Sequence, residues 1–169
     1  MKVLHRKTNE QHEAVIELVK DEDWEIIDKS GQFEFNWRVE KNYLVQKIRL
    51  KLEDEILGLI SIEDIPNELR LHIRLIERNK SNKGREKEYD YVAGCLIAHT
   101  CKVSFEKEYD GFVSLKPKTK LVEFYKNKYG FREMGQFLYT ELSNSEILIK
   151  KYLVHAIVRA ILPTDLVKK

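Results

Sequence analysis

Residues 79–105 constrain the fold of this chain more than any other segment, because a basic loop there runs directly into an amphipathic helix. Between residues 78 and 88 the chain has five basic and two acidic side chains, and it contains one glycine, Gly84. The first turns of the helix carry the small residues Ala93 and Gly94. Free N–H groups at a helix N-terminus attract anions, and small side chains let a phosphate approach the backbone. The segment therefore indicates an anion-binding site; the alternative is a solvated loop before an ordinary core helix.

The length and charge of the chain limit the classes of protein to which it can belong. It has 169 residues, of which 43% are hydrophobic and 34% charged, and its net charge is +2. This composition is typical of a soluble globular protein, and the length allows one domain with its own core, spanning residues 1–169. A nearly balanced charge gives no argument for binding of the whole protein to nucleic acid or to a membrane surface.

The sequence gives no indication of a disulfide-bonded, metal-binding or membrane protein. Cys95 and Cys101 lie on one predicted helix, where their spacing turns them by roughly 600° to opposite sides, so a reducing cytoplasm fits best. The histidines at positions 5, 12, 72, 99 and 155 lack the spacing of metal ligands, and we expect no metal. The N-terminus is polar by residue 5 and no apolar run reaches membrane-spanning length, so we expect neither a signal peptide nor a membrane partner.

The N-terminal third predicts two helices and a strand. Thr8 and Gln11 form a capping-box pattern, followed by apolar residues at helical spacing up to position 19. A second short helix is expected around residues 24–27 and should end at Ser30 and Gly31. Aromatic and polar residues alternate over residues 33–39, which predicts a strand.

The middle of the chain predicts three antiparallel strands joined by short turns. They cover residues 43–52, 56–62 and 69–77. The second is almost continuously apolar, which indicates that both of its faces are covered. The turn between the second and third strands contains Pro66 and Asn67.

The C-terminal half predicts helices that alternate with strands. A helix over residues 89–108 leads to a strand over 112–115, which should pair in parallel with the strand before the loop. Another helix is expected to begin near Thr119 and to end at Gly130, and a last strand should cover residues 137–142. A capping-box pattern then starts a long C-terminal helix over residues 143–163.

This order of elements and three short motifs resemble the GCN5-related N-acetyltransferase (GNAT) family. The segments 124–131 and 58–63 resemble a helix ending in glycine-phenylalanine and the central strand of that family. The family's pyrophosphate loop has Arg or Gln, two residues, Gly, one residue, then Gly or Ala. Here Ala93 fits the last position, but Tyr91 stands at the first glycine and Glu88 at the Arg or Gln. The resemblance spans residues 43–142 and implies a mixed α/β fold: a mostly antiparallel sheet with a splayed parallel strand pair and flanking helices, plus the C-terminal helix.

The resemblance implies a cosubstrate and a set of residues that would bind it. It implies acetyl-coenzyme A (acetyl-CoA) and acetyl transfer to the amine of a small molecule or a protein. The pantetheine arm would lie along the strand before the loop, where a backbone N–H near Leu75 or Ile76 would stabilise the oxyanion. The phosphates would lie against the loop and the helix start, which carry these candidate binding residues: Lys83, Gly84, Arg85, Lys87, Tyr91, Val92, Ala93 and Gly94.

The same resemblance implies roles for two catalytic side chains. Tyr125 matches the tyrosine that protonates the leaving thiolate; the alternative is a core tyrosine whose hydroxyl has a structural partner. Glu63 ends the central strand and is the candidate general base, with Asp64 second. For both carboxylates the alternative is a structural role in the turn before Pro66.

Other functions compete with acetyl transfer. The departures in the loop favour a non-catalytic binding or regulatory protein on the same fold. A nucleic-acid partner is disfavoured because the basic loop lacks an aromatic platform. Lys116, Lys118 and Lys120 indicate either a solvated surface or a phosphate clamp. The apolar face of the C-terminal helix is wide enough to pack on its own domain or to form a homodimer.

Overall fold

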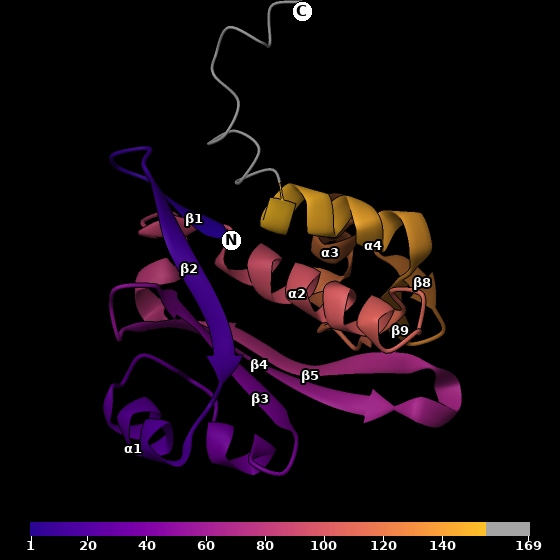
Figure 1. Cartoon of the computed structure of the whole chain (residues 1–169), viewed down its shortest axis with the longest axis horizontal. Coiled ribbons are helices and arrows are strands. Elements are labelled where there is room, and N and C mark those ends of the chain that lie inside the picture. The colour runs from indigo at the N-terminus through magenta and orange to yellow at the C-terminus, as the bar shows by residue number, and fades with distance from the viewer. Residues whose placement is uncertain (155–169) are drawn as a thin grey trace, which may run out of the picture.

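A nine-stranded, mostly antiparallel sheet forms the body of the computed structural model, which describes residues 1–154 (Figure 1). Residues 155–163 of the predicted C-terminal helix lie outside the described residues. Within these limits the spatial order of the strands is β6-β1-β2-β3-β4-β5-β7-β9-β8. The strands are β1 (Lys2–His5), β2 (Gln11–Leu18), β3 (Leu44–Leu50), β4 (Ile56–Ile65), β5 (Arg70–Arg78), β6 (Tyr89–Asp90), β7 (Val113–Leu115), β8 (Arg132–Met134) and β9 (Phe137–Thr140). The mixed α/β architecture is the predicted one.

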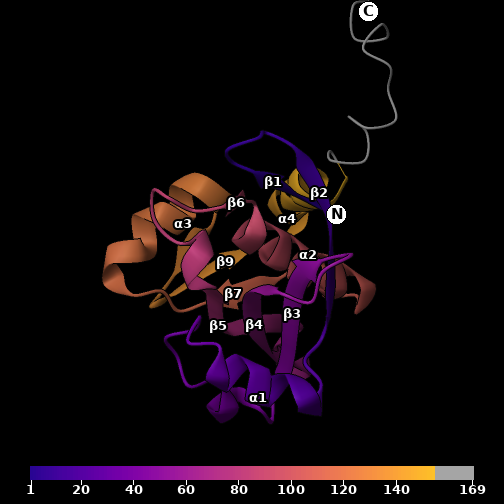
Figure 2. The same ribbon diagram turned by 90° about the vertical axis from the view of Figure 1, so that its left-hand side faces the viewer.

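Helices cover both faces of the sheet, and each face has its own apolar core. The helices are α1 (Asp21–Lys29), α2 (Val92–Glu106), α3 (Val122–Tyr129) and α4 (Leu142–Ile149). Helix α1 lies on one face, and α2 and α4 lie on the other (Figure 2). The larger core lies between the sheet and α2, and the smaller one contains Trp24, Ile27 and Trp37. Strand β4 is buried from Ile56 to Ile62, as its apolar sequence predicted.

Strands β5 and β7 form the parallel pair of the sheet, and they separate after three paired residues. Their register runs from Leu71 opposite Val113 to Ile73 opposite Leu115, where β7 ends. Strand β5 continues to Arg78 and stays paired with β4, with a register shift opposite Ser61 and Ile62. The β7-facing edge of β5 is therefore without a strand partner beyond Ile73. This is the splayed pair that the resemblance implied.

The predicted helix over residues 8–19 is wrong, because residues Gln11–Leu18 form strand β2. Ala14 and Ile16 both contact the larger core at a spacing of two residues. Strands β1 and β3 pair with β2 on its two sides and use its backbone groups. Thr8 lies in the turn before β2, where its hydroxyl is 3.0 Å from Nδ1 of His5. The spacing of the apolar residues in this segment is compatible with a helix and with a strand. Pairing with the neighbouring strands makes it a strand.

The predicted strand over residues 33–39 is also wrong; the segment is a loop followed by the 3₁₀ turn Trp37–Glu40. Glu77 of β5 holds it. The Glu77 carboxylate accepts hydrogen bonds from the backbone N–H of Glu34 at 2.6 Å and from the indole Nε1 of Trp37 at 2.8 Å. Lys83 forms an ion pair with the same carboxylate at 2.9 Å. The buried side chain of Glu77, distant in sequence, thus forms the hydrogen bonds with this segment that a neighbouring strand was predicted to form.

The C-terminal half follows the predicted order with shifted boundaries. Helix α3 begins after the 3₁₀ turn Thr119–Leu121 and so later than Thr119, and it ends at Gly130, whose φ is +69°. Strand β8 was not predicted, and β9 ends at Thr140 rather than at 142. Helix α4 continues as a π-helical turn, Lys150–Val154, and packs on α2 of its own domain. Homodimer formation through this helix stays a prediction.

Helix α2 begins in a backbone conformation that glycine adopts without strain. Its N-cap residue, Tyr91, has φ 76° and ψ 2°, in the left-handed region that disfavours residues with a Cβ. The loop before it is joined to the sheet, because β6 pairs with β1. Tyr91 therefore occupies a position of glycine type, as the comparison with the pyrophosphate-loop pattern suggested.

The conformation of Tyr91 predicts the relative stability of two variants. Tyr91→Gly and Tyr91→Ala both remove the aromatic ring, but only Ala keeps the left-handed penalty. We expect the Gly variant to be about 1 kcal/mol more stable than the Ala variant in urea unfolding. An Ala variant as stable as the Gly variant would show that this backbone position does not require a left-handed residue.

The contacts of Glu77 predict a pH dependence of stability. Burial raises its pKa, but the hydrogen bonds from Glu34, Lys83 and Trp37 outweigh burial and hold the pKa below the usual 4.5. The stabilisation is therefore present above pH 4.5 and is lost as the pH falls through the lowered pKa of the folded state. We expect Glu77→Gln to reduce the free energy of unfolding by about 2 kcal/mol at pH 7, and by less below pH 4.

The matched control for this experiment is Glu86→Gln, which changes an exposed glutamate in the loop before α2. Its unfolding curves should overlay those of the original protein at both pH values. If the two variants lose stability equally, or if the Glu77→Gln difference persists unchanged at low pH, the ionised carboxylate of Glu77 does not hold this loop.

Candidate functional site

A cleft of about 580 Å³ opens where β5 and β7 separate, and this volume is in the range of small-molecule sites. One wall is the unpaired part of β5, including Leu75 and Ile76, and the opposite wall is the segment after β7 together with α3. Ala93 at the start of α2 closes one end. Of the predicted binding residues, the cleft brings together Leu75, Ile76, Lys83 and Ala93.

Tyr125, the predicted proton donor, lines this cleft from α3. Its ring packs among other aromatic rings, with centroid distances of 5.9 Å to Tyr129 and 6.0 Å to Phe131. Burial raises the pKa of Tyr125, and Arg78 offsets part of this rise. The phenol is therefore protonated at neutral pH. Within residues 1–154 we find no hydrogen-bond partner of its hydroxyl.

The two predicted carboxylates project in different directions. Glu63 lies beside the cleft but does not line it, and its carboxylate is 3.3 Å from Nη1 of Arg74. Arg74 does line the cleft. Asp64 instead binds the end of α2 and the turn after it, accepting a hydrogen bond from Tyr109 and pairing with Lys107 at 2.9 Å. Only Glu63 is therefore near the cleft.

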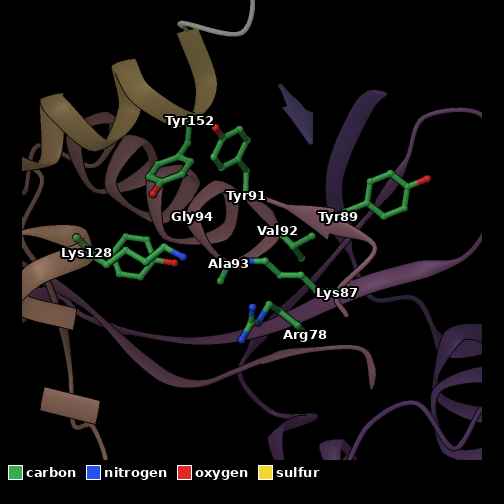
Figure 3. A pocket seen from close by; sticks show the side chains of 10 residues that line it. Arg78, Lys87, Tyr89, Tyr91, Val92, Ala93, Gly94, Lys128 and Tyr152 are labelled. Atoms are coloured by element: carbon green, nitrogen blue, oxygen red, sulfur yellow. The ribbon is translucent and has the colours of Figure 1, made fainter. Parts of the chain in front are cut away.

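A second, much smaller pocket lies at the N-terminus of α2 (Figure 3). Its volume is about 10 Å³, enough for one water-sized sphere. The predicted residues that line it are Lys87, Tyr91, Val92, Ala93 and Gly94. Five further lining residues were not predicted: Arg78, Tyr89, Lys128, Tyr129 and Tyr152. The pocket is continuous in its lining with the cleft, because Arg78, Ala93 and Tyr129 border both.

Three cationic side chains, Arg78, Lys87 and Lys128, line this pocket. Their mutual repulsion contributes to a lowered pKa of Lys128. Burial lowers the pKa of Lys128, and Lys87 and Arg78 lower it further, whereas Asp90, which forms an ion pair with Lys87 at 2.5 Å, raises it. Figure 3 shows the amino groups of Lys87 and Lys128 and the guanidinium of Arg78 directed toward a common space below the helix start. An anion placed there would relieve the repulsion and would meet the positive end of the helix dipole.

Glu88 does not weaken this positive potential from inside the pocket. Its carboxylate lies 3.8 Å from Nε2 of His5 in β1, and it is not part of the pocket lining. Gly84 and Arg85, both predicted binding residues, are exposed and line neither the pocket nor the cleft. The predicted contribution of the loop is thus limited in this structure to Lys83 in the cleft and Lys87 in the pocket.

Two buried asparagines hold the loop before α2 in place. Asn79 donates to the carbonyl of Ile56 in β4 at 3.1 Å, and its own side-chain oxygen accepts a hydrogen bond from Asn82. Asn82 in turn accepts a hydrogen bond from the backbone N–H of Tyr89 at 2.8 Å. These amides replace backbone pairing in a segment that has little regular structure, so the loop is fixed on β4.

The position of Gly94 suggested that a phosphate approaches the backbone there, but in the structure an aromatic ring lies against this glycine. A Cβ at Gly94 would lie 2.2 Å from the ring of Tyr152 in the π-helical turn after α4. The missing side chain therefore makes room for this aromatic ring. The sequence carried no signal for this contact, because it joins residues 58 positions apart that pack helix on helix.

The cleft also has a basic rim. Lys116, Lys118 and Lys120 line it, and Lys118 lies 5.6 Å from the ring centroid of Phe35 on the opposite wall. The three lysines therefore belong to the cleft rather than to a remote surface. Within residues 1–154, no three His, Cys, Asp or Glu side chains gather in a way that could hold a metal ion. In the same range no helix is long and apolar enough to cross a membrane.

Comparisons with known proteins identify the fold. No protein-family model and no curated protein matches the sequence. Among solved structures, the ribosomal-protein-S18-alanine N-acetyltransferase from Escherichia coli matches with a TM-score of 0.57 at 8% identity, over 77% of this chain and 94% of that chain. A mutant of the toxin AtaT, bound to the C-terminus of the antitoxin AtaR and acetyl-CoA, gives 0.55 at 14%, over 82% and 99%. An N-acetyltransferase from Staphylococcus aureus gives 0.53 at 13%, over 77% and 99%.

These identities are too low to transfer a substrate, but the likeness covers most of every chain compared. The matched structures include two N-acetyltransferases. The splayed strand pair and the cleft at its opening agree with what the sequence resemblance implied. The protein therefore has the fold of the GCN5-related N-acetyltransferases.

Proposed function

We propose that this protein transfers the acetyl group of acetyl-CoA to the amine of a small molecule or a protein. The observation that carries the proposal is Tyr125, a protonated phenol on the wall of the cleft where β5 and β7 separate. The fold is that of acetyltransferases, including one solved with acetyl-CoA. The free edge of β5 and the cations at the start of α2 fit the amides and the phosphates of this cosubstrate.

The cofactor would be held at two ends. Backbone groups of β5 beyond Ile73 lack a strand partner on the cleft side, so they are available to the amides of the pantetheine arm. Arg78, Lys87 and Lys128 would attract the phosphates at the other end. From Ile73 to Arg78 the strand rises roughly 16 Å, which separates the reacting end from the charged end.

Residues of the cleft would then support each stage of the transfer. The bound thioester supplies an activated acyl group to the attacking amine. A backbone N–H near Leu75 or Ile76, next to the register shift in β5, would donate to the developing oxyanion. Tyr125 would give its proton to the departing thiolate. Glu63, which lies beside the cleft and pairs with Arg74, remains the candidate base for the amine.

One observation favours the competing function, a non-catalytic protein on the same fold. The pocket at the α2 N-terminus has room for one water-sized sphere, so phosphate binding there requires side chains to move. Lys87 and Lys128 have flexible chains that can do so at small cost. Measurement of cofactor binding separates the two functions.

The cationic pocket predicts salt-sensitive binding of coenzyme A. We expect calorimetry to detect binding that is weaker than in typical members of the fold family and about threefold weaker again at 0.5 M than at 0.1 M salt, because salt screens the phosphate contacts. Pantetheine, which lacks the phosphates, is the control and should show no salt dependence. Absence of heat and of a thermal shift at millimolar coenzyme A would favour the non-catalytic function.

Tyr125→Phe tests the proton donor once an acceptor amine has been found by screening. The ring and its packing remain, but the donor is lost, so we expect turnover to fall about 100- to 10,000-fold. Coenzyme A affinity and melting temperature should stay unchanged. Tyr139→Phe, which removes a hydroxyl of β9 outside the cleft lining, is the matched control. Turnover within threefold of the original would assign the proton to water.

A further inference from the structure

Two tyrosine hydroxyls at the N-terminus of α2 have no assigned role in the proposed chemistry. Tyr129 at the end of α3 and Tyr152 in the turn after α4 both line the small pocket, and each residue is only 3% exposed. Within residues 1–154 neither hydroxyl has a hydrogen-bond partner. The side-chain atom that is fully buried without a partner in this range is Gln46 Oε1, so the two tyrosine hydroxyls are open to the pocket and can donate to a ligand there.

The rings of Tyr129 and Tyr152 pack against each other at a centroid distance of 6.1 Å, and Tyr152 has further contacts. The ring of Tyr152 lies against Gly94 and makes an edge contact with Tyr91 at 5.8 Å. Its backbone carbonyl accepts a contact from the Cys95 thiol at 3.7 Å. Figure 3 shows the Tyr152 hydroxyl directed toward the space near Lys128, between the helix start and α3. The Tyr152 hydroxyl is therefore placed in advance, and the side chains that must move to admit a phosphate are the flexible lysines, Lys87 and Lys128.

We infer that Tyr129 and Tyr152 donate hydrogen bonds to the phosphates of the cofactor, so that α3 and the C-terminal segment complete a site that the loop alone leaves incomplete. The inference rests on the proposed function for the identity of the ligand. It gives a physical reason for the departures in the loop, because side-chain donors take over where Tyr91 and Glu88 replace the expected glycine and Arg or Gln. It also explains why position 94 is glycine, because a larger residue would clash with the Tyr152 ring.

The protonation state of the two phenols agrees with a donor role. Burial is the main cause that raises the pKa of Tyr152 to about 12, and burial also raises the pKa of Tyr129. Both hydroxyls therefore keep their protons at neutral pH and can donate to an anion. Arg78, Lys87 and Lys128 border the same pocket and supply the charge that the phenols lack. A donor to an ionised group contributes more to binding than a neutral pair.

The test compares single hydroxyl deletions with two probes, inorganic pyrophosphate and coenzyme A. We expect Tyr152→Phe and Tyr129→Phe each to weaken the binding of both probes about tenfold in calorimetry. Pantetheine affinity should not change, since that molecule has no phosphate. Tyr89→Phe is the matched control, because Tyr89 borders the pocket but Figure 3 shows its hydroxyl directed away. Melting temperatures monitor whether the rings still pack.

Each outcome decides between the inference and the proposed function. If coenzyme A binds equally well to the original protein and to both variants, the tyrosine inference is wrong and the proposed function stands. If pyrophosphate binds through the tyrosines but coenzyme A does not bind, the phosphate site stands and the proposed function is wrong. If neither probe binds to the original protein, or if Tyr89→Phe weakens binding as much as the other variants, the assignment of these hydroxyls is overturned.

Discussion

The separation of β5 and β7 after Ile73 and Leu115 is the constraint on which the rest of the site depends. Two features of the chain enforce it. Pro117 follows β7 by two residues and has no N–H to donate, so the parallel ladder cannot continue there. The register shift near Arg74 changes the side-chain alternation of β5 at the same level. The cleft exists because one strand ends while its neighbour continues, and α3 with Tyr125 forms the far wall of the resulting gap.

Glu77 connects the two loops that flank this gap. Its side chain is 2% exposed and binds the backbone after α1 together with Lys83 of the loop before α2. An ionised carboxylate is kept in a buried place only when its oxygens are fully used, and here hydrogen bonds and an ion pair use them. The positions of Phe35 on one wall and of Lys83 at the cleft edge therefore depend on a single residue near the C-terminal end of β5.

Local patterns in the sequence predicted the three antiparallel strands and the helix that ends at Gly130, since each depends on nearby residues, and the strand–helix–strand order predicted the parallel pair. They failed where a distant partner decides the structure. Residues 33–39 alternate like a strand, but Glu77 uses their donors; residues 11–18 fit a helix, but β1 and β3 pair with both edges. The same limit applies to the site. The loop and Tyr125 have local signals, whereas Arg78, Lys128 and Tyr152 join the pocket only through packing of elements far apart in sequence.

The pairing of β1 with β6 has a consequence for folding order and local opening. Leu4 lies opposite Asp90, so a contact between residues about 86 positions apart positions the loop before α2. Contacts of such sequence separation form late in folding, and a two-residue edge pair opens at a lower free energy than the central strands. The cationic pocket is thus built next to a short edge pair of the sheet. A ligand that closes it would slow amide hydrogen exchange at the N-terminal residues of β1, which lie outside the pocket lining.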